Sequence, residues 1–170
     1  QVLLVSGIGQ AAKAPHYLRA NVFNGLHGRS LPPAIGAKLA NPELTVIAES
    51  GDGCMYGEGG NHFLAALRRN LDLTILAHDN RVYGLTKGQA SPTSEFGKRT
   101  KSTPMGSVDT PIMPLTIALA AEASFVARSV DTHTEHLQGT LERAGRHKGS
   151  SFVEVLQNCN IFNDGAWRDF

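Results

Sequence analysis

The stretch ESGDGCMYGEGGNHFLAALRRNLDLTILAHDN, Glu49–Asn80, decides the fold class. An apolar run, LTVIAES (44–50), leads into it, and a second run, LDLTILAHD (71–79), closes it. Continuous β-branched and apolar runs of this length are typical of strands that are buried on both faces of a sheet. Between the runs, Phe63 and Leu67 share one helical face. We therefore predict a strand–helix–strand unit here.

The same alternation continues along the whole chain. Further strands are predicted at VLLV (2–5), SFVARSV (124–130) and SFVEVL (151–156), and further helices at LPPAIGAKLA (31–40), PLTIALAAEA (114–123) and around Leu137, Leu141 and Ala144. Alternating strands and helices favour an α/β fold: an open, mostly parallel sheet with helices on both faces. We expect residues 1–170 to form a single domain.

Composition excludes several classes of function. The 170 residues carry 16 basic and 15 acidic side chains, a net charge of +1, so neither nucleic acid nor an anionic membrane is an expected partner. No apolar run is long enough to span a bilayer, and nothing in these residues resembles a basic-then-apolar signal peptide. Two cysteines are too few for a disulfide framework, which favours the reducing cytoplasm. Because the chain is strand-like directly from Gln1, we expect an N-terminal segment upstream of it.

Polar residues follow two successive strands of the predicted unit. Gly51, Asp52 and Gly53 end the first strand, and Asp79 and Asn80 end the second. In a parallel sheet both turns lie at the carboxyl edge, where ligands of this fold class bind. Carboxylate and amide oxygens suit Mg²⁺, which commonly completes its shell with substrate phosphates. An Asp-Gly turn alone is ordinary, but the matched pair favours a site for Mg²⁺ and a diphosphate.

Four stretches make the chain similar to a known family. They are SGIGQAAKAPHY (6–17), LHGRSLPPAIGAKLANPEL (26–44), GDGCMYGEGGNHFLAALRRN (51–70) and DNRVYGLTKGQASPTS (79–94). Together they resemble the thiamine diphosphate-binding beta subunit of 2-oxoacid:ferredoxin oxidoreductases, and the resemblance runs to EVLQNC at Cys159. It implies the thiamine diphosphate-binding fold and oxidative decarboxylation of a 2-oxoacid, pyruvate or 2-oxoglutarate, to acyl-CoA and CO2, with electrons passed to ferredoxin.

The resemblance also implies roles for individual residues. Asp52, Asn80 and the backbone carbonyl of Val82 are the implied Mg²⁺ ligands. The implied cofactor contacts are Gly7, Ile8, Gly9 and Gln10 near the thiazolium ring, His27, Gly51, Gly53 and Cys54 near the diphosphate, and Tyr83, Gly84, Leu85 and Thr86 around the cofactor. Lys13 matches a lysine that binds the carboxylate of the substrate, and a cation there suits an anionic 2-oxoacid.

A partner subunit is implied as well. The glutamate that activates thiamine diphosphate belongs to a pyrimidine-binding domain, which in this family lies on a larger alpha subunit. We therefore expect the chain to be inactive alone and to work with that subunit, ferredoxin and coenzyme A.

Two positions depart from the family pattern. Cys54 stands where an aspartate is usual, and Gln10 stands where the family often has a cysteine ligand of a 4Fe–4S cluster. Only Cys159 matches a cluster cysteine, and one thiolate does not hold such a cluster. An unseen upstream segment could supply the other thiolates, so the presence of a cluster stays an open question.

The alternative function is that of a non-catalytic scaffold subunit with a degenerate site. A generic nucleotide-binding domain is disfavoured, because the chain lacks GxGxxG and a P-loop lysine.

Residues 81–113 have no helical or strand periodicity. A stretch this long is uncommon in a compact domain unless it is functional or mobile. It carries more cations than anions. Either these side chains are simply solvated, or they dock an acidic ferredoxin or close over the substrate.

Overall fold

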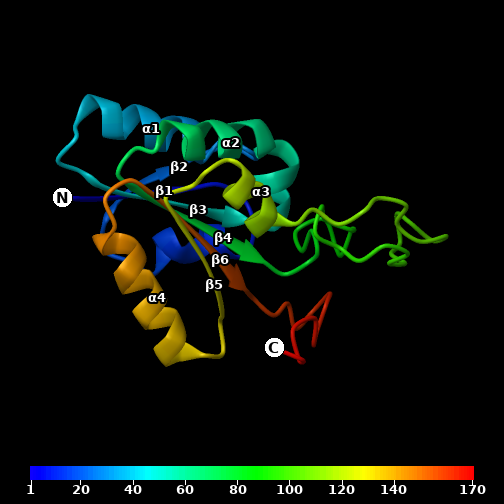
Figure 1. The fold of residues 1–170 in the computed structure, drawn as a ribbon. Helices are drawn as coiled ribbons and strands as arrows, with labels where there is room; N and C mark the ends of the chain where they lie inside the picture. The colour runs from blue at the N-terminus through cyan, green and yellow to red at the C-terminus, as the bar shows by residue number, and fades with distance from the viewer.

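The computed structural model describes residues 1–170 and contains a six-stranded, all-parallel sheet with helices on both faces (Figure 1). The strands are β1 (Val2–Ser6), β2 (Asn21–Asn24), β3 (Thr45–Gly51), β4 (Leu73–Asp79), β5 (Phe125–Val130) and β6 (Ser150–Leu156), in the spatial order β2-β1-β3-β4-β6-β5. The predicted open parallel sheet is confirmed. Only β2, at one edge, lacks a strand signal in the sequence, because all four of its residues are exposed.

The helices form two layers around this sheet. They are η1 (Ala11–His16, a 3-10 helix), α1 (Leu31–Ala40), η2 (Gly53–Glu58, a π-helix), α2 (Gly60–Arg69), α3 (Pro114–Ala120) and α4 (Thr134–Arg146). Figure 1 shows α1, α2 and α3 over one face of the sheet and α4 on the other. The predicted third helix is shorter than expected, since Glu122 adopts φ +57° soon after its end.

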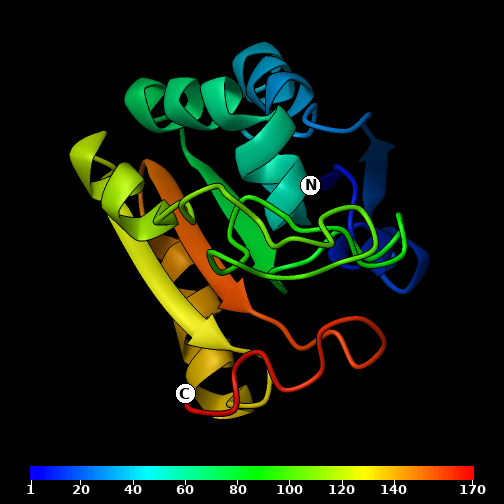
Figure 2. The ribbon, with the colours of Figure 1, turned by 90° about the vertical axis from the view of Figure 1, so that its right-hand side faces the viewer.

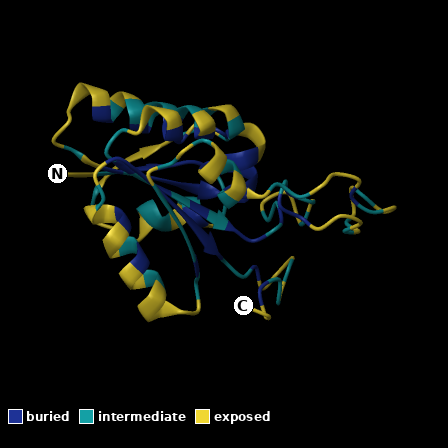
Figure 3. Cartoon of the chain, in the orientation of Figure 1, coloured by how far each residue is buried: buried dark blue, intermediate teal, exposed yellow.

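The larger core lies between the sheet and the layer of α1, α2 and α3. Its centre is an aromatic cluster in which the rings of Phe63 and Phe152 lie 4.8 Å apart and Tyr56 packs edge-on against Phe63 at 5.6 Å. A smaller cluster around Ala144 and Val153 fills the space under α4. Burying apolar surface at these two contacts stabilises the sheet, which Figure 3 shows buried at its centre.

The carboxyl ends of β3 and β4 lie side by side, with Gly51 paired in register with His78. The polar turns after both strands therefore share one edge of the sheet, as the sequence predicted. Residues 81–113, here called the arm, extend from this edge without helix or strand and cross in front of the strand ends (Figure 2). None of the helices combines the length and the apolar character that a bilayer crossing requires.

Glu49, in β3, carries a buried carboxyl group that lacks a full set of partners. Its side chain is 4% exposed, and Oε1 has no hydrogen-bond partner. Burial raises the pKa of Glu49 from 4.5 to about 7. The folded state therefore binds this proton more tightly than the unfolded state, and stability falls as pH rises from the unfolded pKa to the folded one.

Glu49→Gln is expected to remove that loss. We compare the two proteins by subtracting the free energy of unfolding of the natural chain from that of the variant. This difference should be larger at pH 8 than at pH 4 by roughly 1–3 kcal/mol. Denaturant titrations of both proteins at the two pH values measure this difference. An equal difference at pH 4 and pH 8 would contradict the assigned ionisation.

Candidate cofactor site

A cavity of about 450 Å³ opens at the carboxyl edge of the sheet, a size typical of small-molecule sites. Loops after β1, β3 and β4 meet in it, together with the loop that precedes α1. The lining residues are Ile8, Gly9, Gln10, His27, Gly51, Asp52, Gly53, Cys54, Glu58, Asn80, Val82, Tyr83, Gly84, Leu85, Thr86 and Gln89. The topology thus gathers segments that are far apart in the sequence into one site.

This cavity brings together every residue predicted to contact the cofactor except Gly7. Gly7 lies against the wall, where a Cβ atom would come within 2.7 Å of the Cys54 Sγ. Lys13 is exposed on η1 and is not among the lining residues. Sequence reasoning missed Glu58 and Gln89, which line the cavity. Neither belongs to a motif, although both lie within stretches that carried the family resemblance.

Glycines allow the backbone to approach closely around the cavity. A Cβ atom on Gly53 would lie 2.0 Å from Cε1 of Tyr83, so only glycine fits beside this ring. Gly9 has φ +128°, and a Cβ atom there would lie 2.9 Å from the Gly51 backbone. Side chains at these positions would fill the space between the loops. The result is a cradle of exposed backbone, as diphosphate binding requires.

The turn after β3 does not lead directly into α2. It enters the π-helix η2, and α2 begins only at Gly60. Gly57 and Gly59 lie at this junction between η2 and α2, and glycine stabilises a helix less than most other residues do. Single π-helical turns are frequent at functional sites, and this one places Asp52 immediately before its first residue.

Two buried carboxyl groups share one hydroxyl beside the cavity. The Oγ1 atom of Thr93 lies 2.8 Å from Asp52 Oδ2 and 2.7 Å from Asp79 Oδ1, but it has a single hydrogen to donate. Burial raises the pKa of Asp52 to about 7 and raises that of Asp79, and the neighbouring Asp79 charge adds to the shift at Asp52. A divalent cation would supply the missing positive charge, so these groups fit Mg²⁺.

Asn80 is oriented by contacts at both ends of its amide. Its Nδ2 donates to Gln10 Oε1 at 2.6 Å, and its Oδ1 accepts the backbone N–H of Val82 at 3.1 Å. An amide oxygen has a second lone pair, which is free for a metal. No three His, Cys, Asp or Glu side chains group as a metal site. A cation here would thus depend on Asp52, Asn80, a carbonyl and the oxygens of a bound diphosphate, as is usual for Mg²⁺.

Cys54 connects two loops of the site. Its Sγ accepts backbone N–H groups from Ile8 at 3.2 Å and from Gly28 at 3.0 Å, and its side chain is buried. The thiol thus fills an acceptor position that a carboxylate could also fill. Cysteine at position 54, where the family usually has aspartate, therefore still links the two loops by hydrogen bonds.

The chain alone does not fit a 4Fe–4S cluster. It has two cysteines, both free and buried, and Cys54 is engaged by the loops of the cavity. At the position where the resemblance implies a further cluster cysteine, Gln10 instead accepts a hydrogen bond from Asn80. Four thiolates are the usual ligand set, so no step is assigned to a cluster held by these residues.

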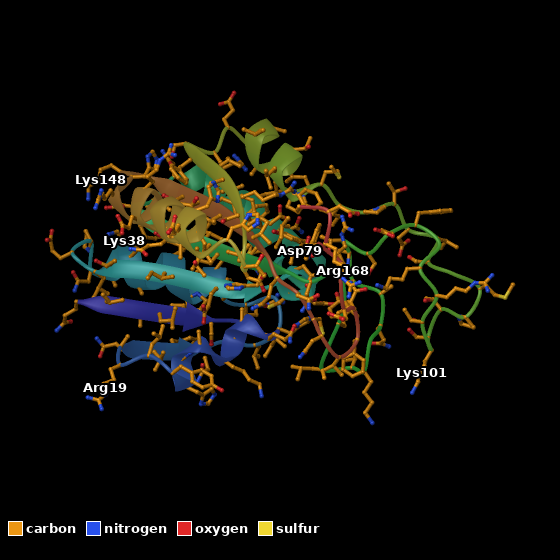
Figure 4. The ribbon with its side chains drawn as sticks, turned by 90° about the horizontal axis from the view of Figure 1, so that it is seen from below. Arg19, Lys38, Asp79, Lys101, Lys148 and Arg168 are labelled. Carbon is orange, nitrogen blue, oxygen red and sulfur yellow. The ribbon has the colours of Figure 1, made fainter.

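A further ion pair, with a buried carboxylate and a partly exposed guanidinium group, lies on the sheet. Arg128 contacts Glu154 Oε2 at 2.6 Å, and burial raises the pKa of this fully buried carboxyl to about 7. The hydroxyl of Tyr56 is buried without a partner. By contrast, Lys38 and Lys148 lie at the end of the sheet opposite to Asp79 (Figure 4). Buried acidic groups thus gather toward the carboxyl edge, where a cation would be stabilised.

Comparison with known proteins places this geometry in a family. Residues 6–155 match the family described as thiamine pyrophosphate enzyme, C-terminal TPP binding domain. The chain is 50% identical over 166 residues to the 2-oxoglutarate oxidoreductase subunit KorB of Mycobacterium tuberculosis, covering 98% of this chain and 44% of the relative. It is 47% identical to the beta subunit of 2-oxoacid:ferredoxin oxidoreductase 1 of Aeropyrum pernix, covering 96% of this chain and 52% of the relative.

A solved structure agrees with these relatives. The 2-oxoglutarate:ferredoxin oxidoreductase of Magnetococcus marinus, determined with 2-oxoglutarate, coenzyme A and succinyl-CoA bound, superposes with a TM-score of 0.96 at 33% identity. The superposition covers 99% of this chain and 58% of that one. This chain spans about half the length of the curated relatives it matches. The resemblance inferred from the sequence is confirmed: the chain belongs to the thiamine pyrophosphate enzyme family and forms its C-terminal, TPP-binding domain.

Proposed function

We propose that this chain is a thiamine diphosphate- and Mg²⁺-binding domain of the beta subunit of a 2-oxoacid:ferredoxin oxidoreductase. The reaction is the oxidative decarboxylation of a 2-oxoacid to acyl-CoA and CO2, with electrons passed to ferredoxin. The observation that carries the proposal is the convergence of Asp52, Asn80 and a glycine-built cradle on one cavity. The names of the relatives support the reaction, and those that specify 2-oxoglutarate favour that substrate over pyruvate.

Each part of the site has a task in this proposal. Asp52, Asn80 and the Val82 carbonyl hold Mg²⁺, and Gly51 and Gly53 open the backbone to the diphosphate. Bound thiamine diphosphate supplies a nucleophilic carbon and an electron sink. The cofactor is further contacted by His27 and by Gly7, Ile8, Gly9, Gln10, Cys54, Tyr83, Gly84, Leu85 and Thr86.

The tyrosine of the cavity wall stays neutral. Burial raises the pKa of Tyr83 to about 12, so its hydroxyl remains a hydrogen-bond donor at neutral pH. A neutral phenol adds no negative charge beside the anionic diphosphate. Lys13 is assigned to the carboxylate of the substrate. It is exposed on η1, so this task requires the substrate or a neighbouring subunit to reach it.

The partners follow from the family to which the chain belongs. The glutamate that activates the aminopyrimidine ring belongs, in the family this chain resembles, to a pyrimidine-binding domain, and we assign that role to a larger alpha subunit. Ferredoxin and coenzyme A complete the reaction, and both cysteines are free, in line with a cytoplasmic protein. The alternative, a non-catalytic scaffold, is disfavoured because Asp52, Asn80 and the cradle all remain.

A binding experiment tests the proposal. The full-length subunit, purified with its larger partner, should melt at a higher temperature with thiamine diphosphate and Mg²⁺ than with either alone. At a ligand concentration 100 times the dissociation constant, binding to the folded state raises the free energy of unfolding by about 2.7 kcal/mol. The subunit without its partner should show no decarboxylation. The absence of any cofactor-dependent shift would favour the scaffold.

A further inference from the structure

Residues 157–170, here called the C-terminal segment, pack against the turn that follows β4. The backbone carbonyl of Asp79 accepts two hydrogen bonds from this segment, from the Gln157 N–H and from the Trp167 Nε1–H, both at 2.9 Å. The next carbonyl, that of Asn80, accepts Nδ2 of Asn163 at 2.8 Å. The segment thus binds both carbonyls of the turn that carries the Asn80 amide.

The following residue of the turn has an uncommon conformation. Arg81 has φ +56°, in the left-handed region, which costs a residue other than glycine roughly 1–2 kcal/mol. Its guanidinium carbon lies 3.8 Å from the centre of the Trp167 ring, a cation–π contact, and its Nη1 pairs with Glu95 at 2.8 Å. Its backbone N–H donates to Asp79 Oδ1 at 2.9 Å. These contacts offset the strain.

The strained residue stands between two assigned metal ligands. Turning the chain at Arg81 brings the backbone N–H of Val82 to 3.1 Å from Asn80 Oδ1. The relative position of the amide oxygen and of the Val82 carbonyl therefore depends on that turn. Mg²⁺ demands near-ideal octahedral geometry, so small shifts of either oxygen weaken its binding.

We propose that Asn163 and Trp167 are positioning residues for the metal: they hold the turn from Asp79 to Val82 in the shape that presents both oxygens. This inference rests on the proposed function of the cavity. Trp167 is 9% exposed, and its Nε1–H bond to the Asp79 carbonyl is buried. Neither residue lines the cavity, so both act through the turn and not by contact with the cofactor.

Asn163 offers a clean test because its two amide atoms have different partners. Its Nδ2 binds the Asn80 carbonyl, while its Oδ1 accepts Nζ of Lys98 from the arm. Asn163→Ala removes both contacts, and Lys98→Met removes only the second. Trp167→Phe keeps an aromatic ring for Arg81 and removes the Nε1–H bond. The three variants therefore separate the effect of the hydrogen bonds to the turn from the effect of the contact with the arm.

The experiment measures Mn²⁺ binding by electron paramagnetic resonance, with saturating thiamine diphosphate, on the full-length subunit in complex with its larger partner. Mn²⁺ is the probe because it takes the oxygen ligands that Mg²⁺ takes. We expect the Mn²⁺ dissociation constant to rise about five- to tenfold in Asn163→Ala and in Trp167→Phe, as for the loss of one hydrogen bond. Lys98→Met should bind as tightly as the natural chain. Saturating metal should restore kcat in both positioning variants, because the ligands of the ion remain and only its dissociation constant has risen.

The possible results distinguish this inference from the proposed function. Tight binding by the natural chain with unchanged affinity in Asn163→Ala and Trp167→Phe overturns the inference and leaves the proposed function standing. An equal loss in Lys98→Met and Asn163→Ala also overturns it, because the arm contact would then explain the effect. A natural chain that binds no Mn²⁺ overturns both. If Trp167→Phe does not fold, the comparison of Asn163→Ala with Lys98→Met decides.

Discussion

Asp52→Ala is expected to weaken Mg²⁺-dependent binding of thiamine diphosphate by about 100-fold or more. The carboxylate is buried, and truncating one partner of a buried charge pair costs about 2–5 kcal/mol. Isothermal titration with thiamine diphosphate in the presence of Mg²⁺, on the full-length subunit with its partner, measures the loss.

The same variant should not lose stability in the absence of cofactor. Without the metal, Asp52 and Asp79 are two buried carboxyl groups on one hydroxyl, and each has its pKa raised by burial. Removing one relieves this arrangement, so the melting temperature without ligand should stay the same or rise. Asp109→Ala, which truncates an exposed aspartate of the arm, is the matched control and should change neither quantity. Cofactor affinity that survives in Asp52→Ala would remove the residue from the metal site.

Gly53→Ala is the second large expected effect. Its new methyl group would lie 2.0 Å from Cε1 of Tyr83 and 2.6 Å from Cζ, distances that force the ring to move. Tyr83 lines the cavity, and its hydroxyl also donates to the Gly53 carbonyl at 3.4 Å. We expect at least a tenfold loss of thiamine diphosphate affinity, together with about 1–3 kcal/mol of stability from overpacking.

Gly60→Ala is the control for this substitution. Gly60 begins α2, and no atom beyond its chain neighbours and its own helix backbone lies within 4 Å of the position its Cβ would take. Alanine there should leave cofactor affinity unchanged and stabilise the helix slightly. Calorimetric titration and thermal unfolding of both variants give the comparison. If Gly53→Ala behaved like Gly60→Ala, close backbone approach would not be what the cavity requires.

Residues with local signals could be predicted from the sequence. The runs that became β3 and β4 are apolar enough to identify buried strands, and parallel strands end at the same edge. That is why Asp52 and Asn80 could be placed in one crevice although 28 positions separate them. Most of the other cavity residues came from the family resemblance and not from periodicity, and Glu58 and Gln89 were not predicted.

Contacts between irregular segments could not be predicted. Thr93 reaches both buried carboxyl groups from the arm, and Trp167 reaches the Asp79 carbonyl from the C-terminal segment. Neither segment has a helical or strand period, so no pattern specifies what their side chains contact. The edge strand β2 was missed for a related reason: with every residue exposed, it lacks the alternation of a half-buried strand.

The most direct measurement is an experimental structure of the full-length subunit with its partner, thiamine diphosphate and Mg²⁺. It should show one octahedral ion joining the diphosphate to a carboxylate oxygen of residue 52, the amide oxygen of residue 80 and the carbonyl of residue 82. An ion held elsewhere, or a diphosphate outside the cavity between the loops after β3 and β4, would contradict the account.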